Sequence, residues 1–276
     1  MTVTEFALLQ FKEPLTEELK ELMDYCQTVQ DTWVLRQQPG LPPNRVDRGT
    51  AMLQQVEDPS VILIAAQWDS PQAHGEWIAS PENQNVMAKL MPHIHVEGPR
   101  AVLFFHLDAP IFAAPVTQPT QASGEHVGGD GGDAAAEAES KTETDAEAAS
   151  KGKEPEAPAA AAAREESKAD AGPPSLLTAP VLSVGRFGVR SEKKKDFTSK
   201  YAEAKSFVEE AARPYPVRGG WRIEKAAEDL EEFVMYCGWS TVEQHKAIAQ
   251  REGFKEWAGI QEFVTGTDIW HYQRII

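Results

Sequence analysis

The chain has 276 residues, 27 of them basic and 43 acidic, which gives a formal net charge of −16 with 41% apolar residues. This length suits one or two domains, each large enough to bury its own core. The acidic excess is the opposite of the basic surface that neutralises phosphate backbones, so we expect no nucleic acid partner. No stretch approaches the ~20 apolar residues of a membrane helix, and the N-terminal segment lacks the features of a secretory signal.

Only two cysteines, Cys26 and Cys237, are present. Two thiols are too few for a disulfide framework and cannot complete a zinc site by themselves. We therefore expect free thiols in a reducing, cytoplasmic environment, without membrane association. We also expect no bound metal, because no carboxylate or cysteine joins His93 and His95 in a plausible ligand set.

Half of the net negative charge is concentrated in one segment, Gln121–Asp170. It contains 15 alanines, 13 acidic and 5 basic residues, hence a net charge of −8, and its single large aliphatic residue is Val127. A segment that can bury so little apolar surface does not offset the entropy lost on ordering, which predicts disorder. We interpret residues 114–175 as a disordered linker between two domains, residues 1–113 and 176–276.

The first half shows strand alternation and helical periodicity in a definite order. Thr16 is the expected N-cap of a helix whose apolar residues repeat at helical spacing. The segment EDPS forms a turn between two apolar runs, and a Ser-Pro pair at residues 80–81 restarts a helix. The expected elements are strand 5–12, the helix after Thr16, strands 49–56 and 61–68, helical segments within 69–90, and strand 101–107.

The second half repeats this order. The expected elements are strand 181–190, a helix that ends at the Pro-rich segment 213–216, strands 220–225 and 232–239, a helical stretch to about residue 263, and strand 268–275. Each half therefore follows the ferredoxin-like βαββαβ plan, an antiparallel sheet with helices on one face. The predicted fold class is α+β, with two such units in one chain.

The two halves also share a motif. The third strand of each half ends in tryptophan and continues as WDSPQAH at residues 68–74 and WSTVEQH at residues 239–245. Asp69 and Ser240 are the expected N-caps of the helices that follow. Each final strand carries an aromatic residue followed by histidine, at residues 105–106 and 270–271. These matches in the same order indicate an internal duplication.

The pattern W-x-S/T-x-E/Q-x-H after the third strand of a βαββαβ unit resembles the antibiotic biosynthesis monooxygenase (ABM) family of the dimeric α+β barrel superfamily. The resemblance covers both halves and leaves the linker unmatched. It implies that two units pack the open faces of their sheets together around a ligand cavity, which a tandem chain can do with its own halves. Residues 61–66 (VILIAA) favour this pairing, because they are apolar on both faces of their strand. Pairing of two chains as a homodimer is left open.

The resemblance further implies cofactor-independent oxygenation of a small aromatic, quinol or polyketide-like molecule, without flavin or metal. A base deprotonates the substrate, which then reduces oxygen itself. His74 and His245 are the candidate catalytic bases, because the start of a helix favours the neutral imidazole that a base requires. The candidate substrate-binding residues, by stacking or by lining the cavity, are Trp68, Trp239, His106, His271 and Tyr236.

Two other functions fit the same residues. One is a catalytically silent barrel that binds a hydrophobic ligand or assembles with itself, in which the histidines serve only the core and the strand-to-helix loops. The other is a polyketide cyclase or isomerase, in which the same histidines exchange protons without oxygen. Because one fold hosts many chemistries, the sequence leaves open whether the protein is an enzyme.

Overall fold

The structure, a computed structural model, describes residues 2–98, 101–112 and 173–276. All of these described residues belong to one compact unit. Nearly all of the predicted linker, residues 114–175, lies outside the described residues, so its disorder stays a prediction. Within the described ranges, no helix is both long and apolar enough to cross a membrane.

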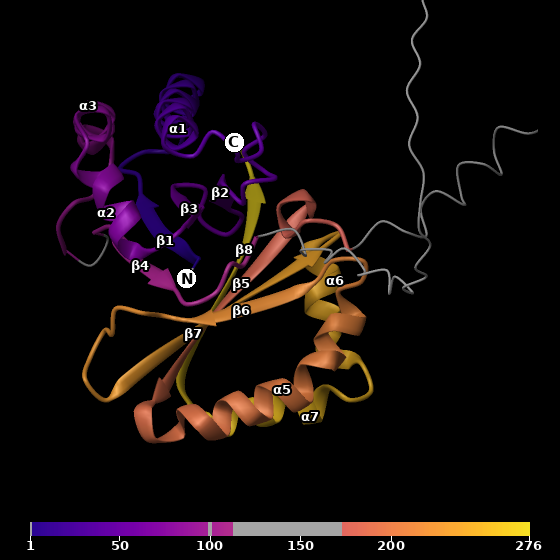
Figure 1. Cartoon of the computed structure of the whole chain (residues 1–276). Coiled ribbons are helices and arrows are strands. Elements are labelled where there is room, and N and C mark those ends of the chain that lie inside the picture. The colour runs from indigo at the N-terminus through magenta and orange to yellow at the C-terminus, as the bar shows by residue number, and fades with distance from the viewer. Residues whose placement is uncertain (1, 99–100, 113–172) are drawn as a thin grey trace, which may run out of the picture. The chain divides into compact units, whose positions relative to one another are not determined.

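The first half forms the predicted βαββαβ unit (Figure 1). Its long helix begins where expected, since the Thr16 hydroxyl accepts a hydrogen bond from the Leu19 N–H at 3.3 Å. The elements are β1 (Val3–Gln10), α1 (Glu17–Gln37), β2 (Ala51–Gln55), β3 (Val61–Trp68), α2 (Pro71–Ala79), α3 (Pro81–Leu90), the short helix η1 (Met91–His93) and β4 (Leu103–Leu107).

The second half repeats the plan with more interrupted helices. Gly253 has a φ of 89°, a left-handed conformation that breaks the expected helical stretch into short pieces. The elements are η3 (Leu176–Thr178), β5 (Val181–Arg190), η4 (Ser191–Lys193), α5 (Lys194–Ala211), β6 (Val217–Trp221), β7 (Leu230–Trp239), α6 (Val242–Ala247), η5 (Ile248–Gln250), α7 (Phe254–Ala258), η6 (Gly259–Phe263) and β8 (Val264–Arg274).

Strand β6 begins earlier than the predicted strand 220–225. It includes Gly219 and Gly220, a residue type that strand propensity disfavours. A Cβ atom at Gly219 would lie 2.4 Å from the ring of Phe233 on the neighbouring strand. The glycine is therefore part of the strand because it leaves room for that ring, a reason that only the packed structure supplies.

The eight described strands form one antiparallel sheet in the order β4-β1-β3-β2-β8-β5-β7-β6. The halves meet at β2 and β8, where Leu53 lies opposite Arg274. They meet again at the ends of this order, where Leu107 bridges Arg222 and the Ile223 N–H donates to the carbonyl oxygen of His106 at 2.8 Å. The sheet is therefore a nearly closed barrel, and the predicted tandem α+β barrel within one chain is confirmed.

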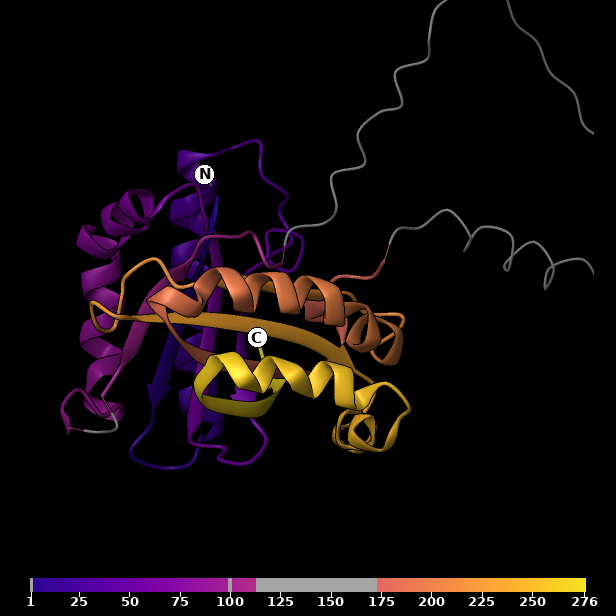
Figure 2. The ribbon, with the colours of Figure 1, turned by 90° about the horizontal axis from the view of Figure 1, so that it is seen from below.

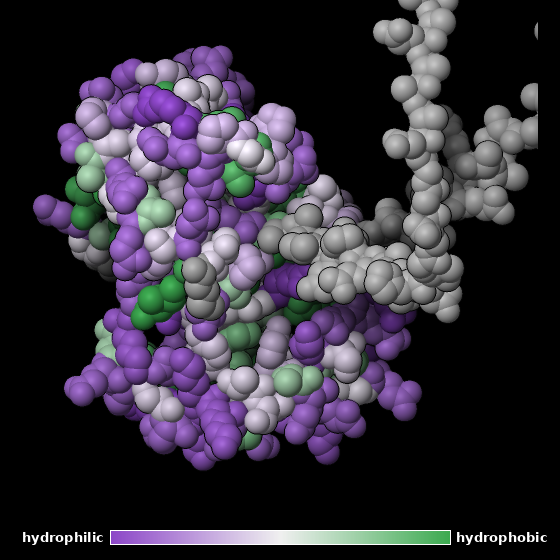
Figure 3. Space-filling model, viewed as in Figure 1, coloured by the Kyte–Doolittle hydropathy of each residue, from purple (hydrophilic) through white to green (hydrophobic). Residues whose placement is uncertain are grey.

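The helices cover the outer face of the barrel, with α1, α2 and α3 on the strands of the first half and α5, α6 and α7 on those of the second (Figures 1 and 2). Alternation along β1 turns Phe6 inward, while Glu5 and Leu9 point to the helices. The surface in Figure 3 is mainly hydrophilic, with small hydrophobic areas. All of the candidate functional residues except Tyr236 belong to the layer between sheet and helices.

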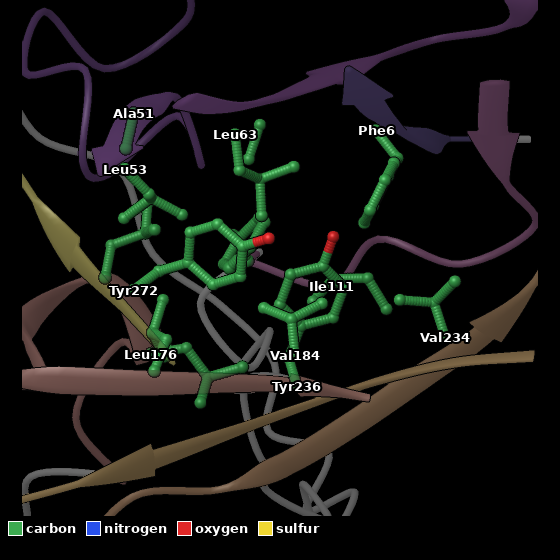
Figure 4. Packing of buried hydrophobic residues seen from close by; sticks show 14 of the residues in the cluster. Phe6, Ala51, Leu53, Leu63, Ile111, Leu176, Val184, Val234, Tyr236 and Tyr272 are labelled. Atoms are coloured by element: carbon green, nitrogen blue, oxygen red, sulfur yellow. The ribbon is translucent and has the colours of Figure 1, made fainter. Parts of the chain in front are cut away.

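Side chains of both halves fill the inside of the barrel (Figure 4). Phe6 and Phe105 stack there with ring centroids 4.6 Å apart, and Tyr236 and Tyr272 reach in from the second half. A hollow of about 450 Å³ remains beside Arg186. Core side chains therefore occupy part of the space between the sheets, where the resemblance implied a ligand cavity, and this hollow is the part that stays open.

Candidate functional site

Each of the two candidate catalytic histidines, His74 and His245, stands on a short helix that begins just after a strand. Ser70, and not the predicted Asp69, is the N-cap of α2, and its hydroxyl accepts a hydrogen bond from the backbone N–H three residues later at 3.1 Å. Thr241, and not Ser240, is the N-cap of α6. Both segments offer two capping residues in succession. In α2 the N-cap is Ser70 because the next residue is Pro71, whose fixed φ suits the first helical position.

Five residues, which we call the first cluster, meet on the outer face of the sheet: Glu5, Trp68, His74, His106 and Glu224. The Trp68 ring stacks on the His74 ring, with centroids 4.3 Å apart and planes 8° apart. Nδ1 of His74 lies 3.0 Å from Nε2 of His106, and Nδ1 of His106 lies 2.6 Å from Oε1 of Glu224. Oε2 of Glu5 accepts a hydrogen bond from Trp68 Nε1 at 3.0 Å and lies 3.5 Å from Nε2 of His74.

The second half contains a matching set, the second cluster: Ser183, Trp239, His245, His271 and Glu57. Trp239 and His245 stack with centroids 4.7 Å apart. Nδ1 of His245 lies 2.8 Å from Nε2 of His271, and Nδ1 of His271 lies 2.5 Å from Oε1 of Glu57. Trp239 Nε1 donates to the Ser183 hydroxyl at 2.8 Å. The structure thus brings together six of the seven predicted site residues, in two groups of three.

The two carboxylates that complete the clusters come from the opposite halves. Glu224 also accepts the backbone N–H of His106 at 2.7 Å, and Glu57 accepts that of His271 at 3.1 Å. Neither glutamate was among the predicted site residues. The sequence carries a weak signal for them, since each follows an apolar residue just after the second strand of its half.

The clusters differ at one position. Glu5 lies opposite His106 in the β1–β4 register, and Ser183 lies opposite His271 in the β5–β8 register. Glu5 and Ser183 are therefore equivalent in the two halves. The first cluster has a buried carboxyl group where the second has a hydroxyl group.

Burial controls the charge of these groups. It raises the pKa of Glu5 from 4.5 to about 7, although the hydrogen bond from the tryptophan indole lowers it. Burial, followed by the neighbouring His106, lowers the pKa of His74 to about 3. Burial, followed by the neighbouring His271, lowers the pKa of His245 to about 4. At neutral pH both helix histidines are therefore uncharged, and Glu5 is divided between acid and carboxylate.

A pocket of about 260 Å³, which we call the helix-side pocket, lies between the sheet of the first half and α1, α2 and α3. Its wall is mainly apolar, and Glu5 and His74 present polar groups on it. It is lined by Glu5, Ala7, Leu9, Cys26, Gln30, Met52, Ile64, His74, Trp77, Ile78, Asn83, Val86, Met87, Leu90, Val102 and Phe104.

Larger side chains occupy the equivalent layer of the second half. Leu9 and Ile62 of the first half correspond in register to Phe187 and Phe233. Phe197 on α5 packs against both rings, with centroid distances of 6.1 Å and 5.4 Å. The two halves therefore differ in the volume left between sheet and helices as well as in the Glu5 position.

Tyr236 belongs to neither cluster. It points into the barrel, where its ring meets Phe112 edge to face at 5.1 Å and its buried hydroxyl has no hydrogen-bond partner. The other six predicted residues lie on the helix side of the sheet. For His106 the reason is strand alternation, because its neighbours Phe105 and Leu107 point inward. Nowhere in the described ranges do three His, Cys, Asp or Glu side chains group as metal ligands.

Two ferredoxin-like units in one nearly closed sheet, with helices outside, define an α+β barrel. This chain is similar to an anthrone oxidase-like protein of known structure, with 10% identity and a TM-score of 0.54. The match spans 100% of this chain and 92% of the other protein's chain. It is also similar to a proposed monooxygenase from Fusobacterium nucleatum, with 9% identity and a TM-score of 0.52. That match spans 100% of this chain and 93% of the other protein's chain. The chain thus shares the fold of these proteins, as the resemblance implied.

A proposed antibiotic biosynthesis monooxygenase from Bordetella bronchiseptica is also similar, at 20% identity, over 35% of this chain and 97% of its own, with a TM-score of 0.30. No family model matches the sequence. No curated protein matches it either.

Proposed function

We propose that the protein is a cofactor-independent monooxygenase that oxidises a phenol or quinol in the helix-side pocket. The observation that carries this proposal is the wall of that pocket, where Glu5 and the neutral His74 stand side by side among apolar side chains. A shared fold with an anthrone oxidase-like protein and a proposed monooxygenase supports the same reaction class. The active site is then in the first half.

The volume of the pocket limits the substrate. An apolar cavity of about 150 Å³ is large enough to bind benzene. At about 260 Å³ the helix-side pocket suits a molecule of one or two rings. We therefore expect a small phenol, quinol or naphthol rather than a three-ring anthrone.

The reaction needs no added reductant. A base removes the hydroxyl proton, and the electron-rich phenolate reduces oxygen and forms a carbon–oxygen bond at the ring. The resulting peroxide anion takes up a proton and becomes a hydroperoxide. The hydroperoxide then loses water, so that one oxygen atom remains as the quinone carbonyl and the other leaves in water. The protein contributes an apolar site that admits oxygen and a polar wall that takes the proton, which together lower the barrier to the first step.

The other residues of the first cluster position His74. Trp68 stacks on one face of its ring, His106 bonds to its Nδ1 atom, and Phe104 meets its edge with a centroid distance of 5.2 Å. In this proposal the second cluster is the structural counterpart, because aromatic side chains fill the layer next to it.

Oxygen consumption by the full-length protein tests the proposal, with a panel of one- and two-ring quinols and naphthols and no added flavin or metal. His74→Ala should lower the rate by about 10²–10⁴, the usual range for losing a group that moves a proton. His245→Ala removes the matching histidine of the second cluster and should have a much smaller effect. Equal losses in the two variants would contradict the choice of the first half.

The alternatives give different outcomes. If the unmodified protein binds these molecules without consuming oxygen, it is a silent ligand-binding barrel. If it converts a polyketide-like molecule without oxygen uptake, it is a cyclase or isomerase. Either result would overturn the monooxygenase proposal.

A further inference from the structure

We propose that Glu5 receives the proton of the substrate and that His74, His106 and Glu224 conduct it from the helix-side pocket to solvent. This inference rests on the proposed function, since it gives the route of the proton that the first step of oxygenation removes from the substrate. It assigns the second half a direct role in the site of the first, because Glu224 is the last group of the route.

The four groups form a continuous path. Nε2 of His74 lies 3.5 Å from Oε2 of Glu5, and the next two links measure 3.0 Å and 2.6 Å. The side chains of Glu5, His74 and His106 are 8%, 4% and 4% exposed, whereas that of Glu224 is 44% exposed. The path therefore begins at a buried wall of the pocket and ends at the surface.

The two hydrogen bonds of this path, between His74 and His106 and between His106 and Glu224, point the same way. The Glu224 carboxylate only accepts, so Nδ1 of His106 carries a proton and, in the neutral ring, Nε2 accepts. Nδ1 of His74 must then donate to that Nε2 atom. Nε2 of His74 is left with a lone pair facing Glu5, which can donate from its protonated carboxyl group. Each group is thus arranged to pass a proton outward.

The transfer balances without any further reactant. The substrate O–H bond breaks and an O–H bond forms on the Glu5 carboxylate. Glu5 then protonates Nε2 of His74 while the Nδ1 proton of His74 moves to Nε2 of His106. The imidazolium of His106, held by Glu224, releases its Nδ1 proton through that carboxylate to water. The net change of this step is one proton lost by the substrate and one gained by the solvent. The peroxide anion formed in the next step takes up one proton by the same path in reverse, so that the whole reaction releases none.

Comparison with the second cluster shows which group of the path is found in the first cluster alone. It has the same His–His–Glu order, but Ser183 stands in place of Glu5. A serine hydroxyl does not take up or release a proton near neutral pH, so this second path has no starting group. Of the two clusters, only the first has a carboxyl group at the buried end of the His–His–Glu order, on the wall of the helix-side pocket.

The titratable groups around Glu5 favour its role. They are His74 on α2, His106 on β4 and the Cys26 thiol on α1, which lines the same pocket. Burial raises the pKa of Cys26, so its thiol stays protonated and does not compete for the substrate proton. Burial also brings the pKa of Glu5 to about 7, near the pH at which a general base works best.

One experiment tests the path independently of any activity. Nitrogen-15 NMR of the imidazoles, assigned with His74→Gln and His106→Gln, should show the Nδ1–H tautomer for both histidines in the full-length protein at pH 6. At this pH Glu5 is mainly protonated. If the neutral His74 ring carries its proton on Nε2, it cannot accept a proton from Glu5 and donate one to His106, and the proposal is overturned.

A second experiment uses a matched pair of variants. Glu224→Gln should lower kcat about tenfold with little change in KM, and a diffusible base such as imidazole should restore part of the loss, because proton release becomes slow. Glu57→Gln makes the same change at the equivalent position of the second cluster and should leave kcat within about twofold. Equal values for the two variants would reject the relay. If the unmodified protein consumes no oxygen, the proposed function fails instead, and the tautomers of His74 and His106 still decide the path.

Discussion

Nδ1 of His106 and Oε1 of Glu224 lie 2.6 Å apart, although 118 residues separate them along the chain. His271 and Glu57 make the equivalent contact, in which the histidine belongs to the second half and the glutamate to the first. Each half thus contributes the final carboxylate to the cluster of the other. Both clusters can form only when the two halves assemble into one barrel.

The first prediction concerns this assembly. Residues 1–115 and 172–276, expressed together as separate chains, should copurify as a 1:1 complex through a tag on one of them. The reason is that each half alone would expose the barrel interior, where Phe6, Phe105, Tyr236 and Tyr272 pack. Size-exclusion chromatography of the purified complex gives its mass. Two stable, separate monomers would contradict the prediction.

The contact between the halves should also be measurable as a coupling energy. His106→Gln and Glu224→Gln are made singly and together, and the free energy of unfolding of each variant is measured in urea. The change in the double variant should differ from the sum of the single changes by about 1 kcal/mol, the size of a partly exposed charged hydrogen bond. His106→Gln combined with Glu57→Gln is the matched control, because these residues belong to different clusters. Its effects should add. Equal coupling in both pairs would show that the contact itself is not the cause.

The pH dependence of stability tests the buried carboxyl group. The pKa of Glu5 is raised to about 7 in the folded protein, so its contribution to stability is complete below about pH 4.5 and is lost as the pH rises through 7. Glu5→Gln should abolish this loss. Relative to the variant, the unmodified protein should lose on the order of 3 kcal/mol between pH 4.5 and 7.5.

His74 and His245 change the stability with pH in the opposite direction to Glu5. Both histidines are present in the unmodified protein and in the Glu5→Gln variant. The lowered pKa values of His74 and His245 contribute stability above pH 6.5 that is lost as the pH falls through 4 and 3. Comparing the unmodified protein with Glu5→Gln at each pH therefore removes their contribution. A constant difference between the two proteins from pH 4.5 to 7.5 would mean that Glu5 is not held in its acid form.

A final prediction concerns the helix-side pocket. Ala7→Leu adds three carbon atoms to its wall and should weaken binding of 2-naphthol, followed by its fluorescence, by about tenfold or ~1.4 kcal/mol. Met52→Leu, on the same wall, conserves volume and should bind nearly as well as the unmodified protein. The unfolding midpoint of each variant should be unchanged. Undiminished binding by Ala7→Leu would place the ligand elsewhere.

The sequence by itself determined the elements and their order. Alternation and apolar runs predicted strands 61–68 and 181–190 with the bounds that the structure has, and Thr16 marked the start of α1. The repeated Trp-to-His spacing and the aromatic-His pair of each final strand indicated a duplication and marked six of the residues that meet in the clusters. These features are local, because strand pleat, helical period and N-capping depend on residues a few positions apart.

The tertiary structure alone decided where the site lies and how it is completed. The inward packing of Phe105 and Leu107 turns His106 to the helix side, and closure of the sheet carries Glu224 to it from the other half. The same sequence motif adjoins an open pocket in one half and a layer packed by Phe187 in the other. These outcomes depend on contacts between residues more than a hundred positions apart and on the volumes of facing side chains, which no local pattern encodes.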